Sequence, residues 1–168
     1  AKDLTLTQSS KAYSAITKIV TDGKVTLASS DPKIVKISGS KIIPAAPGKA
    51  TITIAAEQGK NYEAVQKTIT VTVRPLTATN LTLKSKNKGQ VTTSWTSVKS
   101  VSGYQIYYSQ NSNMKGAKYV TAKSTAKSVT LKKLTSKKKY YVHIRTYKTV
   151  NGKKYYSSWS SVKSVTVK

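Results

Sequence analysis

The residues that could carry out acid–base chemistry are few in this sequence. The chain of 168 residues has one histidine, His143, no cysteine, and five carboxylate side chains. The five acids all lie before residue 74, and none belongs to an Asp-x-Asp cluster. They are Asp3, Asp22, Asp31, Glu57 and Glu63. General acid–base catalysis and hard-cation binding both need such groups close to a partner. We therefore expect a protein that is not an enzyme and that holds no metal or cofactor.

Aromatic side chains provide the first candidate binding surface. His143 lies between Val142 and Ile144, which are expected to face the core, so His143 should face outward. The predicted ligand surface consists of Tyr107, Tyr141, His143, Arg145, Tyr147 and Trp159. The last hairpin adds Tyr155 or Tyr156. Exposed rings can stack on sugars or bases. Alternatively, they form cross-strand aromatic and cation–π pairs that only stabilise the sheet, by about 0.5–1 kcal/mol each.

Lysine dominates the charge of the chain. The formal net charge is +25, and residues 75–168 hold 18 lysines and Arg145 but no carboxylate side chain, which gives that stretch +19. Such a charge attracts polyanions, and lysine favours diffuse attraction over the bidentate recognition typical of arginine. One lysine-rich turn supplies the candidate polyanion contacts. They are Lys132, Lys133, Lys137, Lys138 and Lys139. The alternative is a solvated turn with no partner.

The elements that would position these residues are strands. Apolar and polar residues alternate along several short runs of the first half, as expected of half-buried strands. These runs are Lys24–Leu27, Lys33–Ile37, Thr51–Ala55 and Thr68–Val73. Turn signals such as Asp22-Gly23 and Asp31-Pro32 separate the runs at short intervals. The first half therefore reads as a small β-sandwich.

The amino-acid sequence of the first half resembles those of a known family. Ser29–Gly39, Ile43-Pro44 and Pro47–Ile54 are similar to the turns and core strands of bacterial Ig-like (Big) domains, and Asn61–Ala64 also recurs in such modules. The resemblance covers residues 4–74. It implies an Ig-like sandwich and no chemistry.

The second half alternates in the same way. Val91–Trp95, Gly103–Tyr108, Tyr140–Tyr147 and Ser164–Val167 are predicted strands. Asn151-Gly152 predicts a type I′ hairpin turn, because both central residues of that turn need positive φ.

These strands resemble a fibronectin type III domain over residues 77–168. The residues that carry the resemblance fall in the family's order along the chain. They are Trp95, Tyr104, Ile106, Tyr108, Leu134 and Tyr140. The resemblance implies that Trp95 lies in the core and that Leu134 and Tyr140 form the tyrosine corner. Ser136-Lys137 replaces the usual Pro-Gly of that corner.

The segment Tyr156–Ser160 is similar to the Trp-Ser ladder of cytokine-receptor type III modules. In that ladder an arginine of the neighbouring strand stacks on the tryptophan, and Arg145 and Trp159 would take these places. Only one Trp-Ser pair is present, so the match to the motif is incomplete.

Together these observations predict an all-β protein of two Ig-like antiparallel β-sandwiches in tandem, residues 1–75 and 76–168. We expect a monomeric, non-catalytic spacer, stalk or adhesin-type segment of a Gram-positive surface or secreted protein. The alternative is a module that binds carbohydrate or an anionic cell-wall polymer and tethers a catalytic domain lying elsewhere. We expect no membrane insertion and, with two arginines only, no specific nucleic-acid partner.

Overall fold

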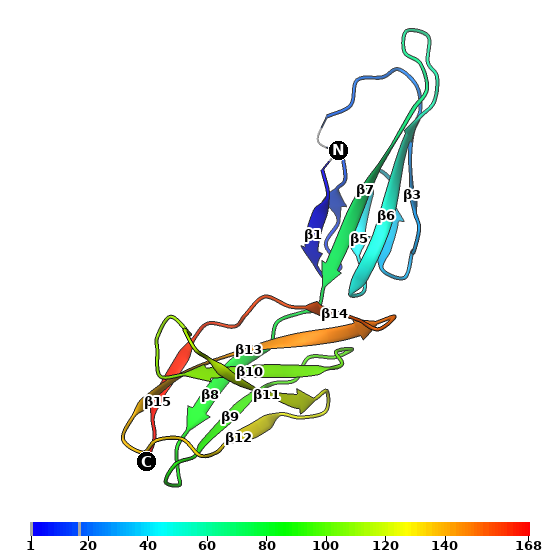
Figure 1. The fold of residues 1–168 in the computed structure, drawn as a ribbon. Coiled ribbons are helices and arrows are strands. Elements are labelled where there is room, and N and C mark those ends of the chain that lie inside the picture. The colour runs from blue at the N-terminus through cyan, green and yellow to red at the C-terminus, as the bar shows by residue number, and fades with distance from the viewer. Residues whose placement is uncertain (1, 17) are drawn as a thin grey trace. The chain divides into compact units, whose positions relative to one another are not determined.

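The computed structural model describes residues 2–16 and 18–168, which form two compact units (Figure 1). The N-terminal unit is Ala1–Arg74 and the C-terminal unit is Pro75–Lys168. The described residues contain strands and no helix. The all-β prediction is therefore confirmed. All five acidic residues belong to the N-terminal unit, the last of them being Glu63.

The N-terminal unit contains two sheets, with strand orders β1-β7-β6-β3 and β2-β5-β4. Its strands are β1 Leu4–Thr7, β2 Tyr13–Ser14, β3 Val25–Ser29, β4 Val35–Ser38, β5 Lys41–Pro44, β6 Gly48–Ala56 and β7 Val65–Arg74. The alternation predicted for β6 and β7 is present, since Ile52, Ile69 and Val71 are buried while Thr51 and Thr68 are exposed. The core between the sheets is aliphatic.

One strand pair departs from the antiparallel arrangement that we predicted. β1 pairs with β7 in parallel, with Leu4 opposite Val71 and Thr7 opposite Arg74. Alternation assigns side chains to faces of a sheet, and it is the same for both strand directions. The direction of β1 is set instead by tertiary pairing with the last four residues of β7, which the local pattern of β1 does not encode.

The C-terminal unit also contains two sheets, β12-β9-β8 and β11-β10-β13-β14. β15 also pairs with β13, at the start of that strand, whereas β14 pairs with its end. The strands of this unit are β8 Thr79–Lys84, β9 Val91–Thr96, β10 Gly103–Ser109, β11 Lys118–Lys123, β12 Ser128–Leu131, β13 Lys139–Val150, β14 Lys153–Tyr156 and β15 Lys163–Thr166. Asn151 (φ 48°) and Gly152 (φ 75°) connect β13 to β14, so the predicted type I′ turn is confirmed.

The core of the C-terminal unit is built around aromatic residues. The rings of Trp95 and Tyr104 lie 5.1 Å apart at 49°, and Ile106, Val142 and Ile144 pack with them in one cluster. Because β10 and β13 alternate, burying these residues leaves the intervening side chains on the outer face of the same sheet. The outer face is where the predicted ligand surface lies.

The corner before β13 holds the predicted tyrosine. The Tyr140 hydroxyl accepts a hydrogen bond of 3.2 Å from the Thr135 N–H, and Leu134 is buried. Lys137, which stands at the family's glycine position, has a φ of 62°. A left-handed conformation costs a non-glycine residue roughly 1–2 kcal/mol. The Lys137 N–H donates to the Val167 carbonyl at 2.7 Å, which helps to hold the turn.

Candidate functional site

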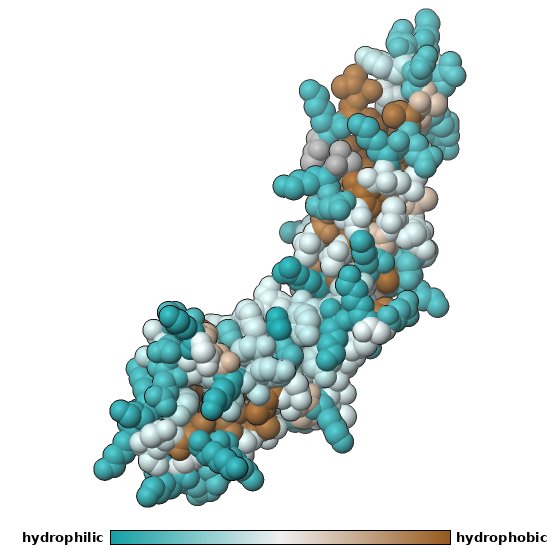
Figure 2. Space-filling model, viewed as in Figure 1, coloured by the Kyte–Doolittle hydropathy of each residue, from teal (hydrophilic) through white to brown (hydrophobic). Residues whose placement is uncertain are grey.

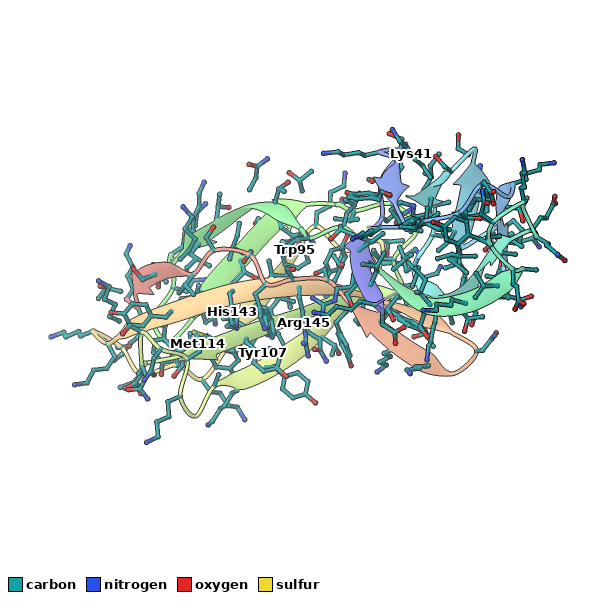
Figure 3. All side chains as sticks on the ribbon, turned by 90° about the horizontal axis from the view of Figure 1, so that it is seen from above. Lys41, Trp95, Tyr107, Met114, His143 and Arg145 are labelled. Carbon is teal, nitrogen blue, oxygen red and sulfur yellow. The ribbon has the colours of Figure 1, made fainter. Side chains whose placement is uncertain are left out.

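The register between β10 and β13 brings the predicted ligand surface together. Tyr107 lies opposite His143, and Gln105 lies opposite Arg145. All four side chains are on the face of the sheet opposite to Tyr104 and the core. Figure 3 shows Tyr107, His143 and Arg145 close together over the sheet.

Trp159 lies at the centre of this group. Its ring stacks on the His143 ring, with centroids 3.9 Å apart and planes at 4°. The Tyr107 ring meets Trp159 edge-on, at 4.8 Å and 69°. Offset-stacked and edge-to-face geometries are the ones that aromatic quadrupoles favour. The faces of Trp159 are thus used within the protein.

Arg145 joins the aromatic rings to one another. Its guanidinium carbon lies 3.9 Å from the Tyr156 ring centroid and 4.4 Å from that of Trp159. Its Nε–H donates to Oε1 of Gln105 at 2.9 Å, which fixes the plane of the guanidinium. Such cation–π contacts each contribute about 0.5–2 kcal/mol, depending on how far the cation is desolvated. We call Tyr107, His143, Arg145, Tyr156 and Trp159 the aromatic ladder.

Two serines hold the segment that carries Trp159. The backbone N–H of Ser157 donates to the Thr146 carbonyl, and the Ser157 hydroxyl accepts from the Thr146 N–H at 3.0 Å. Ser160 makes the same pair of bonds with Ile144, at 2.8 and 3.1 Å. These bonds continue the pairing with β13 across the gap between β14 and β15. Two serines therefore anchor this segment to β13, as in the Trp-Ser ladder named above. Tyr156 stands before Ser157 where a second Trp-Ser pair would have tryptophan.

The environment of His143 disfavours its charged form. Partial burial lowers the pKa of the imidazole below its ordinary value of 6.5, and the positive charge of Arg145 lowers that pKa further. A neutral ring also stacks on Trp159 without the desolvation of a cation. His143 has no carboxylate partner, because residues 75–168 contain none.

Two of the predicted surface residues lie apart from the ladder. Tyr147 packs near Tyr156, with ring centroids 6.1 Å apart, and the Lys154 ammonium lies 5.0 Å from the Tyr147 ring. Tyr141 is paired instead with Lys139, whose ammonium lies 5.5 Å from its ring. The predicted surface is thus one cluster with two neighbours on the same sheet.

Two members of the outer face were not predicted. Tyr119 of β11 lies opposite Tyr107 and stacks on it at 5.0 Å and 13°, with 55% of its surface exposed. Gln105 is buried and accepts the hydrogen bond from Arg145. The signal for Tyr119 was the alternation of Tyr119 and Thr121 against Val120 and Ala122 in a short, lysine-flanked run.

The predicted lysine cluster is divided by the structure. Lys132 and Lys133 line a cavity of about 450 Å³ together with Lys115 and Lys118 from another part of the chain. Lys137 and Lys138 are exposed on the turn before β13 and are not part of that cavity lining. Figure 2 shows hydrophilic residues over much of the visible face of this unit.

Across residues 2–16 and 18–168, no group of three or more His, Cys, Asp or Glu side chains could hold a metal ion. Within the same residues no helix is long and apolar enough to cross a membrane.

The architecture described above is that of Ig-like β-sandwich modules. The family model described as "Fibronectin type III domain" matches residues 74–163, which is more than half of the chain. The chain therefore belongs to the fibronectin type III family, and the predicted resemblance of the second half is confirmed. Modules of this family are commonly non-catalytic spacer or interaction domains. No curated protein matches the chain.

Solved structures agree with the fold. A two-domain fibronectin type III segment of chicken tenascin is 21% identical, with a TM-score of 0.55 over 85% of this chain and 82% of that one. The FN1–FN3 domains of chicken CNTN1 are 19% identical, with a TM-score of 0.51 over 74% of this chain, which spans only 45% of that structure. The fibronectin type III domain of human contactin 1 is 20% identical, with a TM-score of 0.50 over 55% of this chain and 77% of that one.

Proposed function

We propose that the chain is a non-catalytic, monomeric spacer or interaction segment of a bacterial cell-surface or secreted protein. In this proposal the N-terminal unit is a bacterial Ig-like domain, because its sequence at Ser29–Gly39 resembles that family. The observation that carries the proposal is the aromatic ladder, which packs on itself. Rings that would stack on a sugar or base are engaged by His143, Arg145 and each other.

Lysine chemistry supports a second candidate function, attachment to an anionic cell-wall polymer. Four lysines line one cavity of the C-terminal unit, and that unit has no carboxylate side chain to neutralise them. Specific nucleic-acid recognition is less well supported. Of the two arginines, Arg145 is bound by Gln105 and aromatic rings.

Retention on purified Gram-positive cell walls, with and without teichoic acid, distinguishes these functions. The chain would be applied across a salt series, with Trp159→Ala as the variant that opens the ladder. Retention that disappears steeply with salt and with removal of teichoic acid supports attachment by charge. An absence of retention at every salt concentration supports the spacer. Retention that survives high salt and depends on Trp159 would contradict both, because it requires stacking on glycan.

The surface location has its own test. In cells that produce the parent protein, protease added outside intact cells should cleave the chain, or the chain should be found in the medium. Protection of the chain until the cells are lysed would contradict an extracellular role.

A further inference from the structure

One cavity of the C-terminal unit has an unusual lining. It has a volume of about 450 Å³, within the range of about 300–1,000 Å³ typical of ligand sites. It is formed by the end of β10, the loop to β11 with the first residue of β11, the loop after β12, and the start of β13. We call it the lysine pocket, and its charged lining residues are Lys115, Lys118, Lys132 and Lys133.

The positive charge of the lysine pocket is not balanced by any acidic side chain of its own unit. The four lysines come from two separate stretches of the chain, residues 115–118 up to the start of β11 and the loop after β12, and residues 75–168 contain no Asp or Glu. A concave site of one sign raises the local concentration of ions of the opposite sign. Lysine binds phosphate well as a point charge. The pocket therefore favours an anion supplied from outside the unit.

The buried Tyr140 is also part of the pocket lining. Tyr140 is only 7% exposed, and its hydroxyl oxygen accepts hydrogen bonds from the Gln110 amide at 2.9 Å and the Thr135 N–H at 3.2 Å. With both lone pairs accepting, the O–H proton is left for donation to a ligand oxygen.

The electrostatics at Tyr140 are consistent with an anion site. Burial raises the pKa of the Tyr140 phenol, but the hydrogen bonds from Thr135 and Gln110 and the charge of Lys118 outweigh it, so the pKa lies below its usual value of 10.0. The same donors and the Lys118 ammonium thus favour negative charge on the Tyr140 oxygen.

The loop that forms one side of the pocket is held by its own hydrogen bonds. The Lys115 carbonyl accepts from the Ser109 hydroxyl at 2.9 Å and from the Asn111 side-chain amide at 3.0 Å. The Lys115 N–H donates to Oδ1 of Asn113 at 3.0 Å, and Gly116 has a φ of 66°. A loop fixed before binding loses less conformational entropy when a ligand arrives.

From these features we infer that the lysine pocket binds a phosphate group of a polyol-phosphate or sugar-phosphate chain. This inference rests on the second function proposed above and gives it a site. Each phosphate offers several strong acceptor oxygens, which match ammonium, amide and hydroxyl donors arranged around one cavity. The volume also admits part of a chain rather than a single ion.

Titration of the full chain with soluble ligands tests the inference. The probes are a poly(glycerol phosphate) oligomer, inorganic phosphate, and polygalacturonate of equal charge, all at one ionic strength. We expect the oligomer to shift the backbone amide NMR signals of residues 110–118 and 132–134 before others. Inorganic phosphate should shift the same signals more weakly, and equal binding would show that the phosphate group alone is recognised. Preferential binding of polygalacturonate at these residues would overturn the inference.

Two double variants with the same loss of charge separate a site from diffuse attraction. Lys118→Gln with Lys132→Gln removes two pocket lysines, and should weaken oligomer binding about tenfold. Lys123→Gln with Lys127→Gln removes two exposed lysines outside the pocket lining. This variant should weaken oligomer binding less than about twofold, because salt screens charges that do not contact the bound phosphate. Equal weakening by both would overturn the pocket. All four lysines are exposed, so both variants should keep the melting temperature of the unaltered chain.

The cell-wall experiment and this titration can fail separately. Phosphate binding at the pocket without wall retention leaves the site intact and contradicts attachment. Wall retention that is equal for the two double variants supports attachment and contradicts the pocket.

Discussion

The two units use different chemistry to hold similar sandwiches together. In the N-terminal unit, carboxylates hold turns and strand edges together with hydroxyls such as that of Ser30: Asp31 accepts from the Lys33 N–H, and Asp22 accepts from the backbone and side chain of Asn61. In the C-terminal unit hydroxyls and amides do this work, as at Ser157 and Tyr140. A β-sandwich can therefore satisfy its turn amides without acids, and in this case that leaves a unit with positive charge only.

The two units also differ in the side chains that form their cores. The buried core residues of the N-terminal unit are aliphatic, whereas Trp95, Tyr104 and Tyr140 are buried in the C-terminal unit. Tyr104 and Tyr140 add polar anchors, because their hydroxyls accept hydrogen bonds from the Val98 and Thr135 N–H groups. Aromatic residues thus combine packing with the capping that carboxylates provide in the other unit.

The largest expected effect tests the independence of the two cores. Trp95→Ala should lower the free energy of unfolding of the C-terminal unit by about 3–5 kcal/mol, because a large buried ring is removed. Both tryptophans lie in this unit, so Trp159 emission during urea unfolding reports on it alone. Amide exchange in β6 should stay unchanged. Faster exchange there would contradict separate cores.

The next effect concerns the ladder. Arg145→Ala should destabilise the C-terminal unit by about 2 kcal/mol, because it removes contacts with two rings and leaves Gln105 without its donor. Arg145→Lys keeps the charge and should recover part of this loss. Urea midpoints of the two variants measure the difference. A cost for Arg145→Ala near zero would mean that the ladder does not contribute to stability.

A matched pair compares the two ways of holding backbone amides. Ser157→Ala leaves the N–H of the fully buried Thr146 unpaired and should cost about 1–2 kcal/mol. Asp22→Ala exposes the amides of Asn61 to water and should cost less than about 1 kcal/mol, because that site is exposed. Calorimetry of each variant checks the order. A larger cost at Asp22 would reverse the comparison.

The smallest effect is a pH dependence confined to the C-terminal unit. Because burial and Arg145 lower the pKa of His143 in the folded state, the unfolded state binds the proton more readily. The free energy of unfolding should therefore be greatest above pH 6.5, fall as the pH drops through that value, and level off below the folded pKa. Tryptophan-detected urea unfolding between pH 8 and 5 measures it.

His143→Gln provides the control for this pH dependence. The variant should flatten the profile, since no side-chain carboxylate of the unit titrates in its place. A slope that persists in His143→Gln would assign the effect to another group.

Local pattern was enough to predict much of the fold. Alternation identified the strands that became β6, β7, β10 and β13, and it placed His143 and Arg145 on the outer face. Asn151-Gly152 predicted its own turn because positive φ at both positions requires such residues. These are properties of neighbours in sequence.

Non-local pairing accounts for what was missed. The parallel direction of β1 depends on its partner β7, and the stack of Tyr119 on Tyr107 depends on the register of β11. The lysine pocket combines Lys115 and Lys118 with Lys132 and Lys133 only because two separate stretches of the chain meet there. A lysine-rich turn is visible in the sequence, but the loop that faces it is not.

The interruption between β14 and β15 has a mechanical consequence. Force that peels the chain away from residue 168 would break the bonds of Lys168 and Val167 first, then the four residue pairs between β15 and β13, then the bonds of Ser160, then those of Ser157, and β14 last. The final strand would thus yield in stages instead of parting at once. In the spacer proposed above, the first of these stages would absorb extension while the ladder and the hairpin beyond it stay in place.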